Sequence, residues 1–487
     1  MSFTDSYPEL ISYSPLTGEE VGRYRDTSPA DVEQAVARAR HGLKNWQAIG
    51  FSGRKEILQK WAALIAARMD EIAKIISDET GKPISDAQLE ISLALSHLSW
   101  SAKKAHRYLR TSHRAPGLLF ANMSAQVQYV PYGVVGVIGP WNYPIFTPMG
   151  SIAYALAAGN TVVFKPSEFT PGVGHWLGET FNEVAPQANV LFTVTGGPAT
   201  GVALTASGVD KLAFTGSTAT AKKVAAACAT TMTPVVLECG GTDPAIIDRD
   251  ADIAQAAENI LWGAMSNAGQ TCIGIERVYV HNDVADHFIA EISRQAATLK
   301  AGVSYGPATM PSQLKVIDSH IKDAAQHGAQ FIAGSIDSVQ PPFVEPTIML
   351  NVPEDSLAIA EETFGPTLTI TRVATMGEAI VKANASKYGL GASVWSKAHG
   401  KEIAASLECG MVSINSVIAF AGISTLPFGG AKDSGYGRIH GPEGLREFTY
   451  PRSLVRPRFS LPMTFTSFKR TAAADKFVRK MTTILHG

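Results

Sequence analysis

The chain has 487 residues, of which 45% are hydrophobic and 17% are charged, and its formal net charge is −1. This balance is typical of a globular protein with two or three structural units, and it excludes disordered and fibrous chains. The lack of a basic excess argues against a nucleic-acid partner. Four scattered cysteines are too few for a disulfide framework in a chain of this length, so we expect a reducing, cytoplasmic environment.

The sequence contains no common signal for membrane insertion or metal binding. The first ten residues carry Asp5 and Glu9 and lack the basic and apolar regions of a signal peptide. No apolar run approaches the roughly 20 residues that span a bilayer. There is no Cys-x-x-Cys pair and no His-Glu-x-x-His sequence, so we expect no metal site.

The N-terminal part of the chain is expected to form a hairpin followed by helices. Two short apolar segments flank a turn within residues 12–26, as in a hairpin. Ser28 and Pro29 are typical of a helix start. Apolar residues then recur at helical spacing from residue 29, over residues 53–79 and over residues 84–109.

Strands and helices alternate in the next part of the chain. Polar and apolar residues alternate within residues 112–130, which also contain a Pro-Gly turn, and this pattern predicts an extended β-ribbon. The apolar run 133–138 predicts a parallel strand buried on both faces. Alternating strand and helix patterns follow, which predicts an α/β fold with a doubly wound parallel sheet. We expect the strand at 235–237 to begin a second unit that continues to about residue 440.

Several strands run directly into polar turns, where α/β sheets place their ligands. Asn142 follows the first strand and is either an oxyanion donor or a turn-forming residue. Lys165 and Glu168 end the next strand and are either nucleotide ligands or ordinary surface charges. Gly216 and Ser217 precede a helix whose N-terminus is suited to a diphosphate, although Ser217 is also a good N-cap.

Two further segments carry reactive side chains. Glu238 ends an apolar strand beside two glycines, so it is either a desolvated general base or half of a structural salt bridge. Cys272 lies among the small and amide residues 267–274, where it is either a nucleophile or a small buried hydrophobe. Glu362 and Phe364 share one side of an extended segment, where they suit a ribose and an aromatic ring. The glycine-dense segment 427–438 is typical of a site or an interface.

Taken together, in this order and spacing, these segments resemble those of the NAD(P)-dependent aldehyde dehydrogenase superfamily, from about residue 12 to 455. The resemblance implies that Cys272 is the nucleophile, Glu238 the general base and Asn142 the side-chain half of the oxyanion hole. It also implies the hydrolytic branch, because CoA-acylating relatives typically lack the base. The implied cofactor contacts are Trp141, Lys165, Ser167, Glu168, Gly216, Ser217, Glu362 and Phe364.

The same resemblance implies a domain organisation. It comprises a Rossmann-like NAD-binding domain (1–111 and 131–240), an α/β catalytic domain (241–443) and a β-ribbon (112–130 and 444–458) that joins subunits into homodimers or homotetramers. Residues 459–487 extend past the usual family end and combine basic with apolar residues at helical spacing. This amphipathic extension is either a peripheral membrane helix or a helix packed on a neighbouring subunit.

The implied reaction oxidises an aldehyde to a carboxylic acid. Cys272 attacks the carbonyl carbon, Asn142 stabilises the alkoxide, hydride leaves to NAD, and Glu238 activates the water that hydrolyses the thioester. Glu168 would repel the extra phosphate of NADP, so we expect NAD. Two departures from the family pattern, Thr242 in place of lysine and Ala221 in place of glycine, concern cofactor binding.

The substrate implied by the resemblance is a neutral aliphatic or aromatic aldehyde. An apolar tunnel disfavours semialdehydes that bear a carboxylate, unless Arg277 contributes a charge. Residues 441–445 are similar to chains labelled succinate-semialdehyde dehydrogenase, which is the alternative; a non-catalytic binding or structural protein is the alternative of another class. The implied tunnel residues are Tyr143, Phe146, Thr147, Gly150, Ile273, Phe420 and Phe428.

Overall fold

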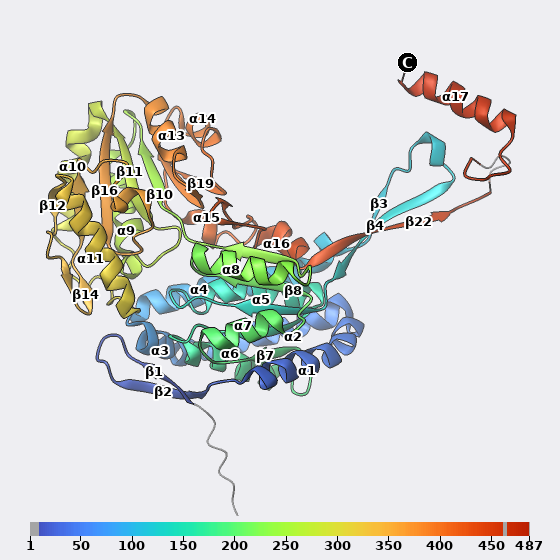
Figure 1. The fold of residues 1–487 in the computed structure, drawn as a ribbon, viewed down its shortest axis with the longest axis horizontal. Helices are drawn as coiled ribbons and strands as arrows, with labels where there is room; N and C mark the ends of the chain where they lie inside the picture. Colours follow the sequence, from blue (N-terminus) through green and yellow to red (C-terminus); the bar gives the residue numbers. More distant parts are fainter. Residues whose placement is uncertain (1–8, 461–464, 487) are drawn as a thin grey trace, which may run out of the picture.

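The computed structural model describes residues 9–460 and 465–486. Figure 1 shows two α/β bodies and a long ribbon that extends away from them. The first body contains a six-stranded sheet of order β21-β9-β8-β5-β6-β7, and the second a seven-stranded sheet of order β12-β15-β16-β11-β10-β18-β19. The predicted α/β fold is confirmed. Asp5, on which the argument about a signal peptide rested, lies outside the described residues.

The N-terminal hairpin and helices form as expected, with one exception. The predicted helix over 53–79 is two helices, because the chain leaves helical geometry at Arg68 (φ −109°, ψ 27°). Apolar spacing continues across this break, so the sequence pattern does not reveal it. The elements are β1 (Glu9–Tyr13), β2 (Glu20–Arg25), α1 (Pro29–Ala48), α2 (Gly50–Ala67), α3 (Met69–Thr80) and α4 (Ile84–Leu109).

The first sheet places the ends of its parallel strands along one edge. Ile138 at the end of β5 pairs with Lys165 of β6 and with Phe214 of β8, while Thr215 pairs with Glu238 of β9. The elements are β5 (Val134–Ile138), α5 (Phe146–Ala158), β6 (Thr161–Lys165), α6 (Pro171–Val184), β7 (Leu191–Thr193), α7 (Pro198–Ala206), β8 (Lys211–Thr215), α8 (Thr218–Ala229) and β9 (Val235–Glu238). The residues that the sequence analysis singled out at the carboxyl ends of these strands therefore meet at this edge.

The expectation that 235–237 begin a second unit is wrong. β9 belongs to the first sheet, and its outer edge is covered by β21 (Gly435–Tyr436), which pairs with it antiparallel. Residues 435–436, which the sequence assigns to the catalytic domain, thus complete the cofactor-domain sheet. β9 is apolar on both faces because Val236 and Leu237 pack into different cores on the two sides of the sheet, and such a strand does not reveal from sequence which sheet it joins.

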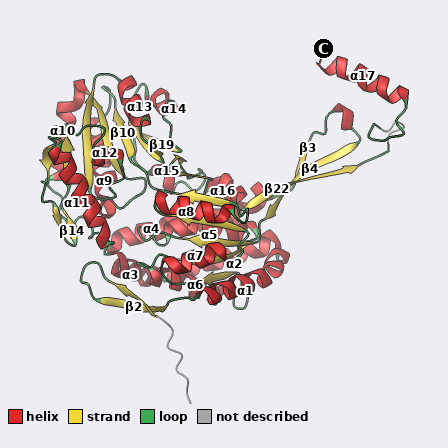
Figure 2. Ribbon diagram, in the orientation of Figure 1, coloured by secondary structure: helices red, strands yellow, loops and turns green. Residues whose placement is uncertain are grey.

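The second sheet is covered by helices on both faces, as Figure 2 shows. Ala245 and Ile247 of β10 pack with α9 and α10, whereas Ile246 points the other way and packs with α13 and α14. The larger elements are β10 (Asp243–Ile247), α9 (Ile253–Met265), β11 (Ile275–His281), α10 (Asn282–Ala296), α11 (Pro311–Gln326), β12 (Gln330–Ala333), β15 (Thr347–Leu350), α12 (Leu357–Ala360), β16 (Thr367–Val373), α13 (Met376–Asn384), β18 (Gly391–Trp395), α14 (Gly400–Ala405), β19 (Met411–Ile414), α15 (Ala419–Gly422) and α16 (Gly441–Glu447).

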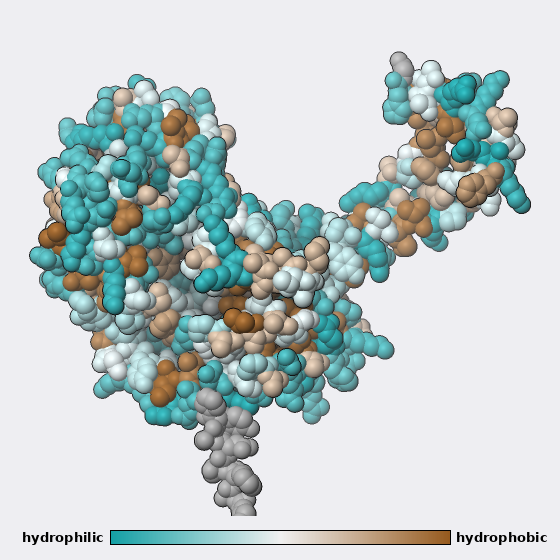
Figure 3. Space-filling model, viewed as in Figure 1, coloured by the Kyte–Doolittle hydropathy of each residue, from teal (hydrophilic) through white to brown (hydrophobic). Residues whose placement is uncertain are grey.

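A three-stranded ribbon and a terminal helix form an arm that stands away from both bodies (Figure 1). β3 (Ser112–Arg114), β4 (Met123–Pro131) and β22 (Thr449–Pro457) make the ribbon, and α17 (Ala472–His486) lies at its far end. Figure 3 shows hydrophobic surface on this arm. The exposed apolar residues of the arm include Val455, Phe459 and Ile484. Within the described residues, no helix is long and apolar enough to cross a membrane.

Candidate active site

The segment that carries Cys272 has an unusual backbone. Asn267, Ala268 and Gly269 are consecutive residues with φ values of 52°, 56° and 69°. The left-handed region costs a residue with a Cβ about 1–2 kcal/mol, so this conformation needs support from neighbouring contacts. Gln270 provides it, because its Nε2 donates to the Asn267 carbonyl at 2.9 Å and its Oε1 accepts from Thr309 N at 2.8 Å. The turn before Cys272 is therefore held in one geometry.

Asn142 is joined to this turn by two sets of hydrogen bonds. Its side-chain Nδ2 donates to the Gln270 carbonyl at 2.9 Å. Its own carbonyl accepts from Asn267 Nδ2 at 3.2 Å and from Lys82 Nζ at 2.7 Å. The structure thus brings Asn142 to the Cys272 segment, although Asn142 does not itself line the cavity described next.

Cys272 and Glu238 line the same cavity, whose volume is about 110 Å³. Neither carboxylate oxygen of Glu238 has a hydrogen-bond partner among the described residues. Burial raises the pKa of Glu238 well above its ordinary value, and Arg438 opposes this only in part. Burial, followed by the nearby Glu362 carboxylate, also raises the pKa of the Cys272 thiol. An unpaired carboxyl with a raised pKa beside a thiol is suited to proton transfer.

Most of the predicted tunnel residues line this cavity, and its walls are largely apolar. Gly150 and Phe420 do not line it. The Phe420 ring is buried, and its Cζ would lie 2.8 Å from a Cβ added to Gly391. The predicted tunnel residues that line the cavity are Tyr143, Phe146, Thr147, Ile273 and Phe428. Residues not predicted include Leu89, Leu93, Trp262, Ile418, Ala421, Ile439 and His440. For Leu89 and Leu93, the only clue in the sequence is their spacing of four residues, which puts both on one face of α4.

Among the described residues that line the cavity, Lys82 is the buried cation, and it is already paired. Lys82 Nζ lies 2.8 Å from Glu90 Oε2, and both side chains are almost fully buried. The other Glu90 oxygen accepts from the backbone N–H groups of Ile145 and Phe146 at 2.9 and 3.2 Å, at the start of α5. Lys82 therefore links α4 to the Asn142 turn, and its charge is balanced within the protein.

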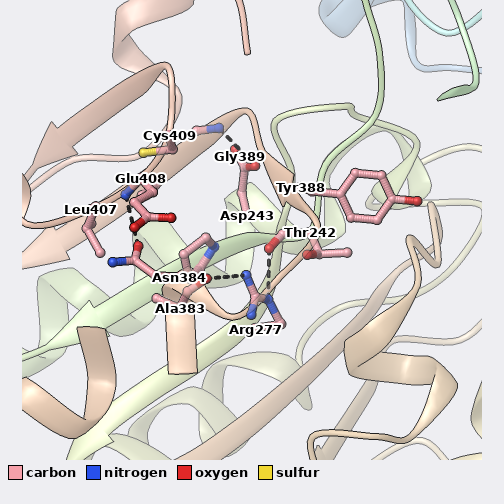
Figure 4. Close-up of a pocket in the computed structure, with 13 residues that line it drawn as sticks. Thr242, Asp243, Arg277, Ala383, Asn384, Tyr388, Gly389, Leu407, Glu408 and Cys409 are labelled. Atoms are coloured by element: carbon pink, nitrogen blue, oxygen red, sulfur yellow. Dashed lines mark hydrogen bonds between the residues drawn. The ribbon is translucent and has the colours of Figure 1, made fainter. Parts of the chain in front are cut away.

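Arg277 lies at a different place. It donates to the Thr242 carbonyl at 2.8 Å and to the Tyr279 hydroxyl at 3.1 Å. Figure 4 shows it in a separate, much smaller cavity, together with Asp243. Burial raises the pKa of Asp243 to about 7, and its Oδ2 has no partner among the described residues. Arg277 is thus engaged in structural contacts and does not line the Cys272 cavity.

Comparison with known proteins identifies the family. The aldehyde dehydrogenase family profile matches residues 3–454. The chain belongs to this family. A Mycolicibacterium smegmatis protein, provisionally named succinate-semialdehyde dehydrogenase with NADP(+) in its name, is 36% identical over 91% of this chain and 88% of its own length. The 4,4'-diapolycopene aldehyde oxidase of a Methylomonas species is 32% identical over 98% of this chain and 91% of its own.

A solved structure supports the same assignment. The crystal structure of the NAD-dependent aldehyde dehydrogenase from Sinorhizobium meliloti matches with a TM-score of 0.88 and 33% identity, covering 94% of this chain and 93% of that one. The names of these relatives include both NAD and NADP(+). Family membership and the α/β fold are therefore shown, and the substrate and the choice of dinucleotide have to be argued from the residues.

Within this aldehyde dehydrogenase, the predicted cofactor residues at the end of β6 are close together. Lys165 is buried, and its Nζ lies 3.7 Å from Glu168 Oε2. Ser167 Oγ donates to the same oxygen at 3.4 Å. Burial lowers the pKa of Lys165, partly offset by Glu168. A carboxylate is therefore held at the edge of the sheet where this fold binds nucleotides.

The other predicted cofactor residues follow β8 or lie near Cys272. Ser217 caps α8 by accepting from Thr220 N at 3.4 Å, and Gly216 N donates to the Glu238 carbonyl at 3.1 Å. Glu362 Oε1 accepts from Gly241 N at 3.0 Å. The Trp141 and Phe364 rings meet edge to face at 5.6 Å.

The Glu362 carboxyl lies tightly against the backbone of Gly240. A Cβ at Gly240 would lie 2.1 Å from the Glu362 oxygens, so only glycine leaves room for this carboxylate. Burial raises the pKa of Glu362 to about 8. Of the two departures from the family pattern, Thr242 places its Oγ1 3.0 Å from Ser386 Oγ, and Ala221 is buried on α8.

One group of residues bears on the expectation that there is no metal site. Among the described residues, Asp248, Asp250 and His399 lie close enough to hold an ion. His399 Nδ1 is 2.9 Å from Asp248 Oδ2, and none of the three lines the Cys272 cavity. Exposed groups of this kind are common without a metal, so nothing in the chemistry below depends on them.

Proposed function

We propose that the protein oxidises an uncharged aldehyde to the carboxylic acid with NAD, through a covalent intermediate on Cys272. The observation that carries this proposal is that Cys272 and the unpartnered carboxyl of Glu238 line one largely apolar cavity. A structural role for Glu238 would be expected to pair its oxygens with a cation or with N–H donors. Their lack of partners favours a role in proton transfer.

The chain's own residues account for most of the reaction. Cys272 first releases its thiol proton to solvent, and its sulfur then attacks the aldehyde carbon to form a thiohemiacetal oxyanion. Asn142, whose amide adjoins the Cys272 turn, stabilises the oxyanion together with the Cys272 backbone N–H. The bound dinucleotide supplies the acceptor for the hydride that leaves this carbon. Glu238 then takes a proton from water as the water attacks the thioester, which releases the acid and regenerates the thiol.

The charge balance of the cavity supports an uncharged substrate. Lys82 is paired with Glu90, and Arg277 is engaged elsewhere. A carboxylate on the substrate would lose its hydration without gaining an unpaired cation, which costs several kcal/mol. The name of the Methylomonas relative specifies 4,4'-diapolycopene aldehyde and not a semialdehyde. The name of the mycobacterial relative supports succinate semialdehyde as the second candidate.

Glu168 supports the choice of NAD over NADP. Its carboxylate is held at the end of β6 by Lys165 and Ser167. A fixed negative charge there repels the 2′-phosphate of NADP, whatever the names of relatives specify. The Glu168→Gln variant is expected to raise the ratio of kcat/KM for NADP to that for NAD on the order of tenfold. An unchanged ratio in steady-state assays would contradict this assignment.

The decisive test of the function is turnover of an aldehyde panel that runs from succinate semialdehyde to heptanal and benzaldehyde. We expect reduction of the dinucleotide with the uncharged aldehydes, a much lower kcat/KM with succinate semialdehyde, and no turnover in Cys272→Ala. The matched control is Cys409→Ala, because Cys409 lines the small cavity of Figure 4 instead. Undiminished turnover in Cys272→Ala would refute the mechanism, and no turnover in the wild type would favour a binding or structural protein.

The arm supports a homo-oligomer. Its exposed apolar residues, including Leu454 and Val455 of β22, need cover from another surface. We propose that the ribbon joins two or four subunits and that α17 packs on a neighbouring subunit. Sedimentation of the full chain and of a chain ending at residue 458 tests this, and an unchanged mass would contradict a role for the extension. Binding of only the full chain to anionic liposomes would instead favour membrane contact. A cytoplasmic location stays a proposal that rests on the four free cysteines.

A further inference from the structure

His440 is a buried imidazole that lines the Cys272 cavity without a hydrogen-bond partner. It is 1% exposed, and neither Nδ1 nor Nε2 has a partner among the described residues. An unsatisfied buried polar group costs about 1–3 kcal/mol, so a histidine at this place needs an explanation. The mechanism proposed above does not use it.

The ring of His440 is fixed from several sides. Its residue has a φ of 62° and immediately precedes α16. The ring lies against Gly150 of α5, where a Cβ would be 2.5 Å from Nε2, and against the ring of His97 with centroids 3.8 Å apart. The Phe146 and Phe428 rings lie at 5.6 and 5.4 Å. The imidazole therefore cannot turn away to find a partner elsewhere without disturbing this packing.

Both histidines of this stacked pair are uncharged near neutral pH. Burial lowers the pKa of His97 to about 4, and burial followed by His97 lowers the pKa of His440 well below its ordinary value. The contacts of His97 are complete, since its Nε2 lies 3.0 Å from the Ala421 carbonyl and its Nδ1 lies 3.2 Å from the Tyr154 hydroxyl. Of the two histidines, only His440 keeps free hydrogen-bonding capacity toward the cavity.

A neutral imidazole has one N–H donor and one acceptor nitrogen. A hydroxyl group, which both donates and accepts, complements either nitrogen. A carboxylate accepts only and is charged, so it finds neither a cation nor a set of donors here. The Phe146 and Phe428 rings beside His440 add contact surface and carry no polar group.

We propose that His440 is a specificity-determining residue that binds a hydroxyl group on the substrate, away from the aldehyde carbon. The preferred substrates are therefore hydroxyaldehydes whose remaining skeleton is apolar. This inference rests on the proposed function, because it takes the Cys272 cavity as the place where the aldehyde binds. At the matching length, the hydroxyl regains in the cavity the hydrogen bond that it gives up in water. At other lengths it stays unpaired, which costs about 1–3 kcal/mol.

The test compares ω-hydroxy aldehydes with ω-methyl aldehydes of equal heavy-atom count, such as 6-hydroxyhexanal with heptanal, over a series of chain lengths. The measured quantity is the ratio of kcat/KM within each pair. In the wild type we expect the ratio to peak at one length. In His440→Leu we expect the peak to fall about 3- to 10-fold, the usual size of one net hydrogen bond. His440→Gln, which keeps a donor and an acceptor, is expected to recover part of the peak.

The control is His175→Leu, since His175 is an exposed histidine paired with Glu179 on α6. It is expected to leave the ratio at every length as in the wild type. The inference is overturned if the wild type shows no peak, or if His440→Leu keeps it. If His440→Leu does not fold, His440→Phe takes its place and is expected to lose the peak, whereas His440→Gln is expected to keep part of it. A peak kept in His440→Phe would overturn the inference. Failure of the proposed function is a separate result, because the wild type would then reduce no dinucleotide with either member of any pair.

Discussion

Two walls of the Cys272 cavity are built on different physical principles. The reaction wall consists of Glu238, Cys272 and the residues around Cys272, and its polar groups are held by hydrogen bonds to backbone atoms or left free for chemistry. The α4 wall consists of Leu89, Leu93, Phe146, Ile418 and His440, and it is held by apolar packing. The reaction wall therefore determines the chemistry for every substrate, whereas the α4 wall determines which substrate fits.

The largest effect expected is on the reaction wall. Glu238→Gln removes the base and is expected to lower kcat by about 10²- to 10⁴-fold for all aldehydes alike. Because the pKa of Glu238 is raised, the wild-type carboxyl is protonated and inactive at low pH, so kcat rises with pH through that raised pKa. The variant should lose this rise. Pre-steady-state kinetics check the cause, since acylation should persist as a burst of reduced dinucleotide. A loss of kcat for only some aldehydes would contradict the separate roles of the two walls.

The next effect concerns the ion pair that links the two walls. Lys82→Met leaves Glu90 as an unpaired buried charge and is expected to lower the free energy of unfolding by about 3–5 kcal/mol. Urea denaturation measures it. Lys60→Met is the matched control, because Lys60 and Glu56 form an exposed pair on α2 and their separation should have no measurable effect. A stable Lys82→Met protein with full activity would show that the walls are held independently.

A smaller effect is expected from the support of the strained turn. Gln270→Ala removes the hydrogen bonds to Asn267 and Thr309 and leaves buried backbone groups unsatisfied, at a cost of about 1–3 kcal/mol. Because the turn positions Cys272, kcat should fall for all aldehydes in parallel. Thermal unfolding and kcat across the panel check both parts. A change in substrate preference without a change in kcat would show that Gln270 acts in substrate selection, as the α4 wall does.

The smallest effect is expected on the α4 wall. Leu93→Ala enlarges the cavity from α4 and should shift the preference toward aldehydes longer by one or two methylenes, on the order of tenfold in kcat/KM. The mechanism should be unchanged, so the pH dependence of kcat should keep its shape. Leu118→Ala, on the exposed tip of the ribbon, is the control that should leave the preference as it is. An equal loss for all chain lengths would contradict a role in selection.

The same contrast explains what the sequence could predict. α8 begins directly after Ser217, as expected from the sequence, because Ser217 is a local N-cap signal. Asn142, Glu238 and Cys272 could be singled out because each follows a strand or lies in a distinctive short segment. Chemistry of this kind depends on local residue types.

The missed features depend on distant packing. His440 occupies the cavity only because Gly150, far away in the chain, leaves space for its ring. Phe420 fits an apolar tunnel by residue type, but it is buried against Gly391 instead. The break at Arg68 interrupts a helix without interrupting its apolar spacing. In each case the pattern of residue types is satisfied by more than one three-dimensional arrangement, so only the structure distinguishes them.

The pairing of β9 with β21 has a consequence for how the enzyme forms during synthesis. β9 ends in Glu238, and the strand that covers its edge is made only after the whole second sheet has been synthesised. Until then, the nascent first sheet presents an open edge, which is a template for pairing with other chains. The environment of the general base is thus completed by one of the last segments to leave the ribosome, and a chain cut short before residue 435 would be both inactive and prone to aggregate.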